Sequence, residues 1–188
     1  MKPNRIVTLL HDQYSKFGGI NYSINEPISI ISHSTQSALW IIQNVSHHNP
    51  NTIVSALLHD YGHITHGPPL SPDQGVNDYH EIIGADALTL LGFPLEVTEP
   101  IRLHVKAKRY LATINPSYTL SFGSQLSLKL QGNLMSHKEL KEFEKNKFFQ
   151  EALLLRHADD SSKDDIIETD TSILTFSKLI QKVLNQPV

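Results

Sequence analysis

Apolar and polar residues follow one another along most of this chain with the period of an α-helix. Apolar positions recur three and four residues apart, in segments separated by glycine, proline or polar clusters. No stretch shows the strict alternation of a half-buried β-strand, and residues 20–27 are expected to form a loop. The fold class is therefore predicted to be all α, with helices at residues 5–17, 29–44, 52–59, 78–91, 94–112, 121–130, 136–146, 148–157 and 171–185.

The helix predicted at residues 52–59 differs from the others because nearly all of its positions are apolar. Such a helix is buried over most of its surface. Asn51 is expected to cap its first turn, and the pattern Ser136-x-x-Glu139 predicts a capping box at a later helix. Residues 66–77, HGPPLSPDQGVN, interrupt the helical pattern and are expected to form a loop at the mouth of a site.

Length and composition narrow the class of protein. The 188 residues predict a single domain over residues 1–188, with its metal-binding core at about residues 20–163 and a C-terminal helix at about residues 171–186. A net charge of −3 without charge blocks argues against a nucleic-acid partner. No segment suits a signal peptide or a membrane span, so a cytoplasmic protein without a membrane partner is expected, as a monomer or a homodimer. The absence of cysteine leaves imidazole and carboxylate groups as the available metal ligands.

The buried helix ends in two groups of the kind that bind metals, His59 and Asp60. Adjacent residues do not share a face of a regular helix, but at a helix end that unwinds at Gly62 both side chains can converge. A carboxylate at a helix C-terminus is unfavourable for the helix dipole, and a bound cation would correct this. Taken alone, the pair could also be hydrogen-bonded to itself at a helix end.

Four further residues of the same types favour a metal site. His33 and His104 lie at core-facing positions, where a single histidine is more often a satisfied core residue than a ligand. His80 follows the proline-rich segment, and Asp159 follows another predicted helix. A set of four imidazoles and two carboxylates from separate helices suits iron, manganese or zinc. The predicted ligands are His33, His59, Asp60, His80, His104 and Asp159.

The order H…HD…H…H…D resembles the HD-domain superfamily over nearly the whole chain. The presence of both His80 and His104 resembles those members that bind two metals, and it implies a helical bundle with a dinuclear site in its core. Asp60 would bridge the two metals. By this resemblance one metal is held by His33, His59, Asp60 and Asp159, and the other by His80 and His104.

A narrower resemblance is to the mixed-valent di-iron oxygenases of this superfamily, the group of 2-amino-1-hydroxyethylphosphonate oxygenase and myo-inositol oxygenase. It is carried by HDYGH at residues 59–63, HVKAKRYL at residues 104–111 and RHADDSSK at residues 156–163, with shorter matches at residues 21–22, 26–27, 115–118 and 131–132. The resemblance implies an enzyme with two iron ions, Fe(II) and Fe(III). Such an enzyme uses O2 to oxidise the hydroxyl-bearing carbon of a small 1-hydroxyphosphonate and cleaves the carbon–phosphorus bond to release phosphate.

The same resemblance assigns substrate contacts. Lys108 lies four residues beyond His104, hence on the same helical face, and would bind the phosphonate; otherwise it is a solvated surface lysine. His63 would donate to a phosphonate oxygen. Ser124 and Arg156 match phosphonate-contacting positions, although Arg156 could equally be an ion-pair partner of Asp159.

Two further roles fall on the segment before His33. The resemblance implies that Tyr22 occupies an iron position until substrate displaces it, and that Glu26 meets the substrate amine. The simpler interpretations are a packing tyrosine and a solvated glutamate. This chain departs from the family pattern by one extra residue between Tyr22 and His33.

Two other classes of function share parts of this pattern. An HD-type metal-dependent phosphohydrolase, acting on a nucleotide or other phosphomonoester, would use the same ligands with manganese or zinc to activate water. A non-enzymatic metal-binding regulator is disfavoured because no second domain is predicted. Tyr22, Glu26 and residues 104–111 favour the oxygenase.

Overall fold

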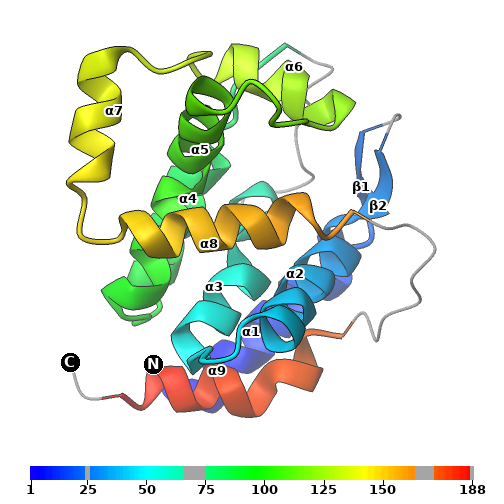
Figure 1. Cartoon of the computed structure of the whole chain (residues 1–188). Helices are drawn as coiled ribbons and strands as arrows, with labels where there is room; N and C mark the ends of the chain where they lie inside the picture. Colours follow the sequence, from blue (N-terminus) through cyan, green and yellow to red (C-terminus); the bar gives the residue numbers. More distant parts are fainter. Residues whose placement is uncertain (24–25, 66–74, 164–171, 187–188) are drawn as a thin grey trace.

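A computed structural model describes residues 1–23, 26–65, 75–163 and 172–186, except for the side chains of Tyr22, Ser23 and Glu26 (Figure 1). Helices dominate this part of the chain, so the predicted all-α class is confirmed. None of its helices is long and apolar enough to cross a membrane. The α-helices are α1 (Pro3–Phe17), α2 (Ile30–Asn44), α3 (Pro50–Leu58), α4 (His80–Leu90), α5 (Leu95–Ile114), α6 (Phe122–Leu130), α7 (His137–Glu144), α8 (Phe149–Asp160) and α9 (Ser177–Leu184), with 3-10 turns η1 (Tyr61–Ile64) and η3 (Ile173–Phe176).

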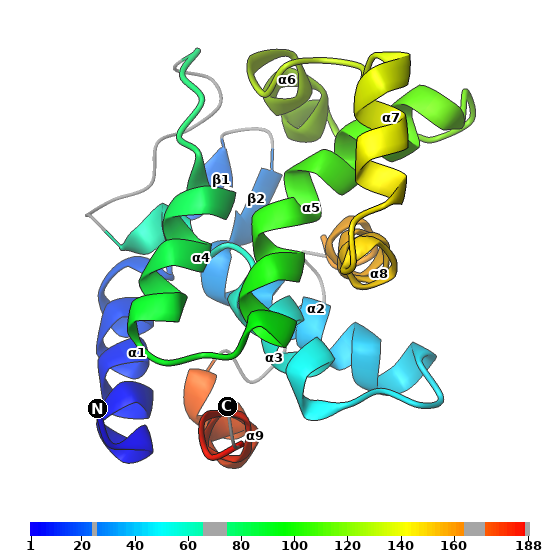
Figure 2. The same ribbon diagram turned by 90° about the vertical axis from the view of Figure 1, so that its left-hand side faces the viewer.

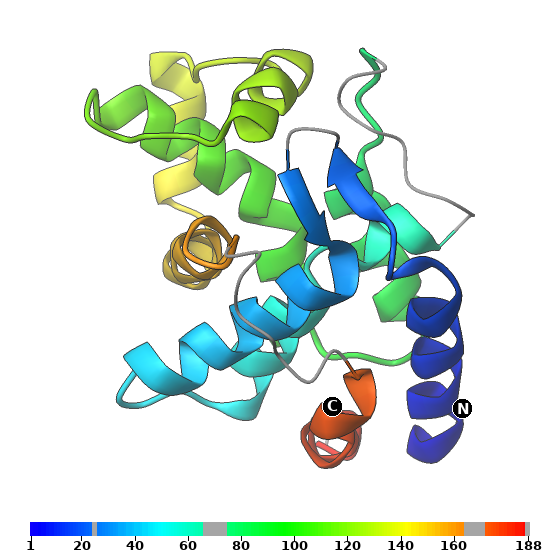
Figure 3. The same cartoon turned by 90° about the vertical axis from the view of Figure 1, so that its right-hand side faces the viewer.

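The loop predicted at residues 20–27 was wrong, because a short antiparallel hairpin occupies this position. Strand β1 (Asn21–Ser23) pairs with β2 (Glu26–Ser29), with Asn21 opposite Ser29. Strands of this length are too short to show an alternating pattern, and Pro27 is tolerated because β2 has a partner on one side only. The hairpin leads directly into α2 (Figure 3).

Several helix starts follow from single polar residues. Ser136 and Glu139 form the predicted capping box at α7. The prediction that Asn51 caps α3 was wrong by two positions, since Asn49 accepts the N–H of Thr52 at 2.9 Å. Pro50 then fills the first helical position, where its missing N–H costs nothing.

Helix α3 lies inside the molecule, with α2, α5, α8 and α9 packed around it (Figures 1 and 2). Leu57 and Leu58 are fully buried, as the apolar pattern predicts. Each buried leucine contributes roughly 1.5–3 kcal/mol to folding. The polar end of this buried helix, His59 and Asp60, is thereby placed in the centre of the molecule.

A second apolar cluster holds α5 and α8 together at the side of α7. Its centre is an aromatic triad in which Tyr110, Phe143 and Phe149 meet edge to face, with ring centroids 5.0–5.5 Å apart. Such pairs add about 0.5–1.5 kcal/mol beyond area burial. This packing holds α5, which carries His104, against α8, which carries Asp159.

Candidate metal centre

Five helices bring the six predicted ligands to one buried place. His33 comes from the first turns of α2, His59 and Asp60 follow α3, His80 begins α4, His104 lies within α5, and Asp159 lies in the last turn of α8. Within the described residues their ligand atoms fall into two groups, each with all atoms within 4.8 Å of one another. The groups are His33, His59 and Asp159, and Asp60, His80 and His104.

Asp60 stands between the two groups. Its Oδ2 lies 2.9 Å from His59 Nε2 and 3.6 Å from His33 Nε2. Its Oδ1 lies 3.6 Å from His80 Nε2 and 3.9 Å from His104 Nε2. Each oxygen therefore faces a different group, which is the arrangement of a carboxylate that bridges two cations.

Backbone carbonyls fix the orientation of three of the four imidazoles. Nδ1 of His33, His59 and His104 lies 2.7, 2.8 and 2.7 Å from the carbonyl oxygens of Ser162, Ala56 and Ile101, respectively. A carbonyl only accepts, so each Nδ1 carries the hydrogen and donates it. Each Nε2 is left with a lone pair directed at the centre, as in histidines that bind metals.

The facing lone pairs call for a cation. Among the described residues no hydrogen bond satisfies His59 Nε2, although Asp60 Oδ2 is 2.9 Å away. Burial lowers the pKa of His59 to about 3, so its ring is neutral at pH 7. His80 and His104 share a hydrogen bond between their Nε2 atoms at 3.1 Å; burial opposes the charged form of His80, but the charge of Asp78 raises its pKa to about 9. His59 Nε2 and Asp60 Oδ2 are buried acceptors that repel one another at 2.9 Å unless a positive charge lies between them, so this donor set fits a pair of metal ions.

Gly62 allows the turn after the His-Asp pair to touch α4. A Cβ at this position would lie 2.0 Å from the backbone oxygen of His80, and one at Gly84 would lie 2.8 Å from the Gly62 nitrogen. The close approach places the ring of His63 on that of His80, with centroids 4.1 Å apart and an interplanar angle of 21°. Gly62 thus allows His63 to lie against His80 at the edge of the centre.

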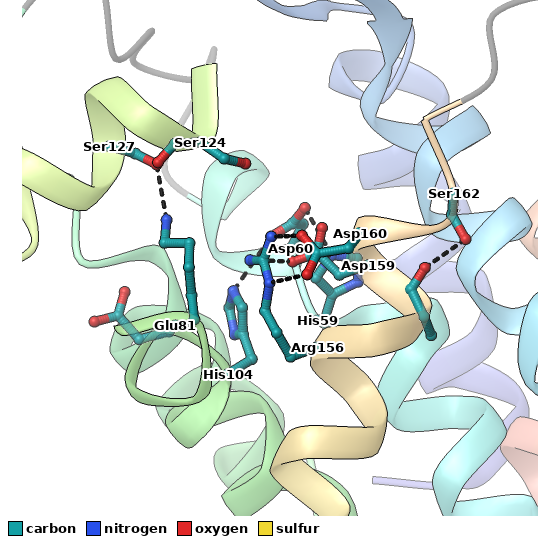
Figure 4. Close-up of polar contacts among 12 residues, drawn as sticks. His59, Asp60, Glu81, His104, Ser124, Ser127, Arg156, Asp159, Asp160 and Ser162 are labelled. Atoms are coloured by element: carbon teal, nitrogen blue, oxygen red, sulfur yellow. Dashed lines mark hydrogen bonds and ion pairs between the residues drawn. The ribbon is translucent and has the colours of Figure 1, made fainter. Parts of the chain in front are cut away.

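A pocket beside the centre carries three cationic side chains, Lys108, Arg156 and Lys163. Lys108 is not a solvated surface lysine: it is 3% exposed, and its Nζ donates to the Ser127 hydroxyl at 2.8 Å. Burial, together with the charge of Arg156, lowers the pKa of Lys108 to about 7. Lys163 donates to the Ser124 hydroxyl at 3.0 Å. Figure 4 shows both serines on α6, across the pocket from Asp60. The cationic lining suits an anionic ligand.

Arg156 also lines this pocket but is engaged by α8 itself (Figure 4). Its Nη1 donates to Asp159 Oδ2 at 2.7 Å, and its Nε donates to Asp160 and to the Tyr118 hydroxyl. Burial opposes ionisation of Asp159, but the charge of Arg156 holds the pKa of that carboxyl well below its usual range. Of the two interpretations of Arg156, these contacts favour an ion-pair partner that orients Asp159.

Some residues predicted from the sequence cannot be compared, and others were overlooked. The side chains of Tyr22 and Glu26, and residues 66–74 of the proline-rich segment, lie outside the described part of the chain. Asp78, which contacts both His63 and His80, was not predicted from the sequence, and Lys163 was not singled out. A carboxylate two residues before a ligand histidine was the available signal for Asp78.

Known proteins with similar sequences agree with this site. No family model matches the chain. It is 35% identical over 184 residues to [1-hydroxy-2-(trimethylamino)ethyl]phosphonate dioxygenase (glycine-betaine-forming) of Leisingera caerulea, covering 96% of this chain and 91% of the relative. It is 39% identical over 165 residues to hydroxymethylphosphonate dioxygenase of Gimesia maris, covering 86% of this chain and 80% of the relative. The resemblance seen in the sequence is confirmed, and the chain belongs to the HD-domain family of phosphonate dioxygenases.

Proposed function

We propose that this protein is a di-iron oxygenase that uses O2 to oxidise the hydroxyl-bearing carbon of a small 1-hydroxyphosphonate, cleaving the carbon–phosphorus bond and releasing phosphate. The observation that carries the proposal is the convergence of four histidines and two aspartates in two groups around Asp60, beside a cationic pocket. Two relatives named as dioxygenases of hydroxyphosphonates support the same reaction.

The ligand assignment follows the two groups. One metal would take His33, His59, Asp60 and Asp159, and the other would take His80 and His104 with Asp60 shared. Six ligands with four imidazoles and no thiolate suit iron that cycles between Fe(II) and Fe(III) and keeps positions open for substrate. When bound, the iron pair supplies the redox chemistry and the Lewis acidity of the reaction.

The overall reaction balances without a further reductant: R–CH(OH)–PO3²⁻ and O2 give R–COO⁻, HPO4²⁻ and H⁺. The protein has to bind a dianion at one end of a small molecule and present the adjacent hydroxyl to the centre. Lys108 would bind the phosphonate, with Ser124 and Arg156 at the same pocket. His63, whose Nε2 lies 3.7 Å from Asp60 Oδ1, would hydrogen-bond a phosphonate oxygen at the edge of the centre.

The hairpin would complete the substrate site. Tyr22 belongs to β1 and Glu26 to β2, and β2 leads into the helix that carries His33. On the resemblance, Tyr22 would bind iron in the resting enzyme and Glu26 would meet a cationic substituent of the substrate. A carboxylate suits an amine or a trimethylammonium group, which the relative from Leisingera caerulea has in the name of its substrate.

The test is anaerobic loading of metal-free protein with iron, followed by parallel measurement of O2 uptake and phosphate release. Hydroxymethylphosphonate and 1-hydroxy-2-(trimethylamino)ethylphosphonate are the trial substrates, with a panel of phosphomonoesters beside them. We expect one phosphate released for each O2 consumed, with hydroxyphosphonates only. Release of phosphate from phosphomonoesters without O2 uptake, with manganese or zinc bound, would instead establish the hydrolase.

A further inference from the structure

Asp78 contacts two histidines with one carboxylate. Its Oδ1 accepts the hydrogen of His80 Nδ1 at 2.8 Å, and its Oδ2 lies 2.6 Å from His63 Nδ1. The two rings stack on each other at 4.1 Å. The side chain of Asp78 is 16% exposed, so it lies at the inner wall of the pocket rather than in open solvent.

An unusual backbone conformation brings this carboxylate to His80. Tyr79 adopts left-handed dihedral angles, φ 51° and ψ 32°, which turn the chain just before α4 begins. Asp78 Oδ1 can therefore also accept the backbone N–H of His80, at 3.3 Å. A non-glycine residue in this region costs roughly 1–3 kcal/mol and persists only where the surrounding contacts hold it.

His80 differs in this respect from the other proposed ligand histidines. Their Nδ1 atoms meet backbone carbonyls, whereas in the described part of the chain His80 has a carboxylate as its hydrogen-bond acceptor. A carboxylate on Nδ1 fixes the tautomer and the ring orientation and makes Nε2 a stronger donor to a metal.

We propose that Asp78 is a positioning residue that holds His80 and His63 as one unit, so that one side chain sets the geometry of a metal ligand and of a substrate contact. The inference rests on the roles of His80 and His63 in the proposed function. It predicts that loss of the carboxylate weakens the metal site of His80 and His104 selectively and also impairs substrate use.

The test compares Asp78→Ala and Asp78→Asn with Asp86→Asn as a matched control. Asp86 lies on α4, the helix that begins at His80, and its exposed carboxylate accepts a hydrogen bond from Arg102 at 2.7 Å, away from the centre. The probe is Mn(II) alone, added to metal-free protein, with the number and affinity of the bound ions followed by equilibrium dialysis and electron paramagnetic resonance. Circular dichroism checks that each variant is folded.

We expect two Mn(II) per chain in the wild type and in Asp86→Asn. In Asp78→Ala one of the two affinities should fall about 10- to 100-fold, the usual effect of removing such a partner, while the other stays unchanged. Asp78→Asn keeps an acceptor for His80 but turns an N–H donor toward His63 Nδ1. Its Mn(II) affinity should therefore be largely recovered, while kcat/KM of the iron-loaded enzyme with hydroxymethylphosphonate still falls.

Each contrary outcome has a separate meaning. Two Mn(II) bound by Asp78→Ala with wild-type affinities would show that Asp78 positions nothing. A third Mn(II) that the wild type binds and both Asp78 variants lose would make His63, Asp78 and His80 a metal site of their own, and would also overturn the proposal. A wild type that binds no pair of ions would remove the ligand assignment of the proposed function, and the inference with it.

Discussion

Burial of the Lys108 amine makes the stability of the fold depend on pH. Its pKa falls from 10.5 to about 7 on folding, because burial and then the charge of Arg156 disfavour the charged form. The unfolded chain therefore holds this proton more tightly than the folded protein does. The resulting loss of stability is absent above pH 10.5, grows as the pH falls toward 7, and is complete below 7.

Replacing Lys108 by methionine should remove this cost. We expect metal-free Lys108→Met to be more stable than the wild type in urea denaturation at pH 7, with the advantage shrinking toward pH 10. With iron bound, kcat/KM should fall by the value of one charged hydrogen bond, about 1.5–3 kcal/mol. Unchanged kinetics with full metal content would remove Lys108 from the substrate site.

Tyr79 offers a residue-scale test of the strained turn before α4. The residue is 55% exposed, so substitutions there act mainly through the backbone. Glycine adopts the left-handed conformation freely, whereas a β-branched residue adopts it with difficulty. Tyr79→Gly should leave stability and Mn(II) affinity within about 0.5 kcal/mol of the wild type, and Tyr79→Val should destabilise by about 1–3 kcal/mol. Urea denaturation and Mn(II) titration of both variants measure these differences. Equal stability and equal Mn(II) affinity of the two variants would mean that the turn stores no strain.

Single residues differ in how far the sequence reveals their surroundings. His59 and Asp60 were found because a polar pair ends an apolar helix and four further residues of ligand type recur elsewhere in the chain; the pair alone would not have sufficed. The flanking Lys106 and Arg109 suggested a solvated Lys108, and only its spacing of four from His104 indicated that it points inward, where its Nζ donates to Ser127 of α6. Asp78 was missed because its role depends on the left-handed turn at Tyr79. A left-handed conformation cannot be predicted from a tyrosine at that position.

At the scale of elements, the close contact between η1 and α4 brings His63 and His80 together. Alanine at Gly62 would place a methyl group 2.0 Å from the His80 carbonyl oxygen, which is backbone and cannot rotate away. We expect Gly62→Ala to destabilise by at least about 1–3 kcal/mol and to weaken Mn(II) binding, because α4 must move. Gly19→Ala is the matched control, since nothing lies within 4 Å of its added Cβ. Thermal unfolding and metal titration of the two variants make the comparison; a neutral Gly62→Ala would contradict it.

Helices with a long periodic pattern were predicted well. Helix ends and short strands, whose formation depends on a few contacts, were predicted poorly. Helix α8 was predicted to end at residue 157, but it continues through Asp160. Arg156 pairs with Asp159 and Asp160, three and four residues on, and these pairs support the last turn. The hairpin at residues 21–29 was missed because its pairing involves very few residues.

For the whole molecule, the metal centre links helices that are distant in the sequence. Without metal, two buried carboxylates and four imidazoles face one another where α2, α3, α4, α5 and α8 meet. Burial raises the pKa of Asp60, because a carboxylate charge is unfavourable away from water. A site that forms only in the folded chain converts metal-binding free energy into stability. Removal of the metal should therefore loosen the junction of all five helices.

The gain in folding stability on metal binding tests the whole centre, and Asp60 is the residue on which the gain at both sites depends. Mn(II) at about 100 times the dissociation constant should raise the free energy of unfolding by about 2.7 kcal/mol for each site, and a chelator should reverse the gain. Asp60→Ala should abolish the gain at both sites, because the shared ligand is lost, while Lys108→Met should keep it, because Lys108 binds no metal. Urea denaturation with and without Mn(II) measures the difference for each variant. An Asp60→Ala protein that kept half of the gain would show that Asp60 serves one metal and that the two sites are independent.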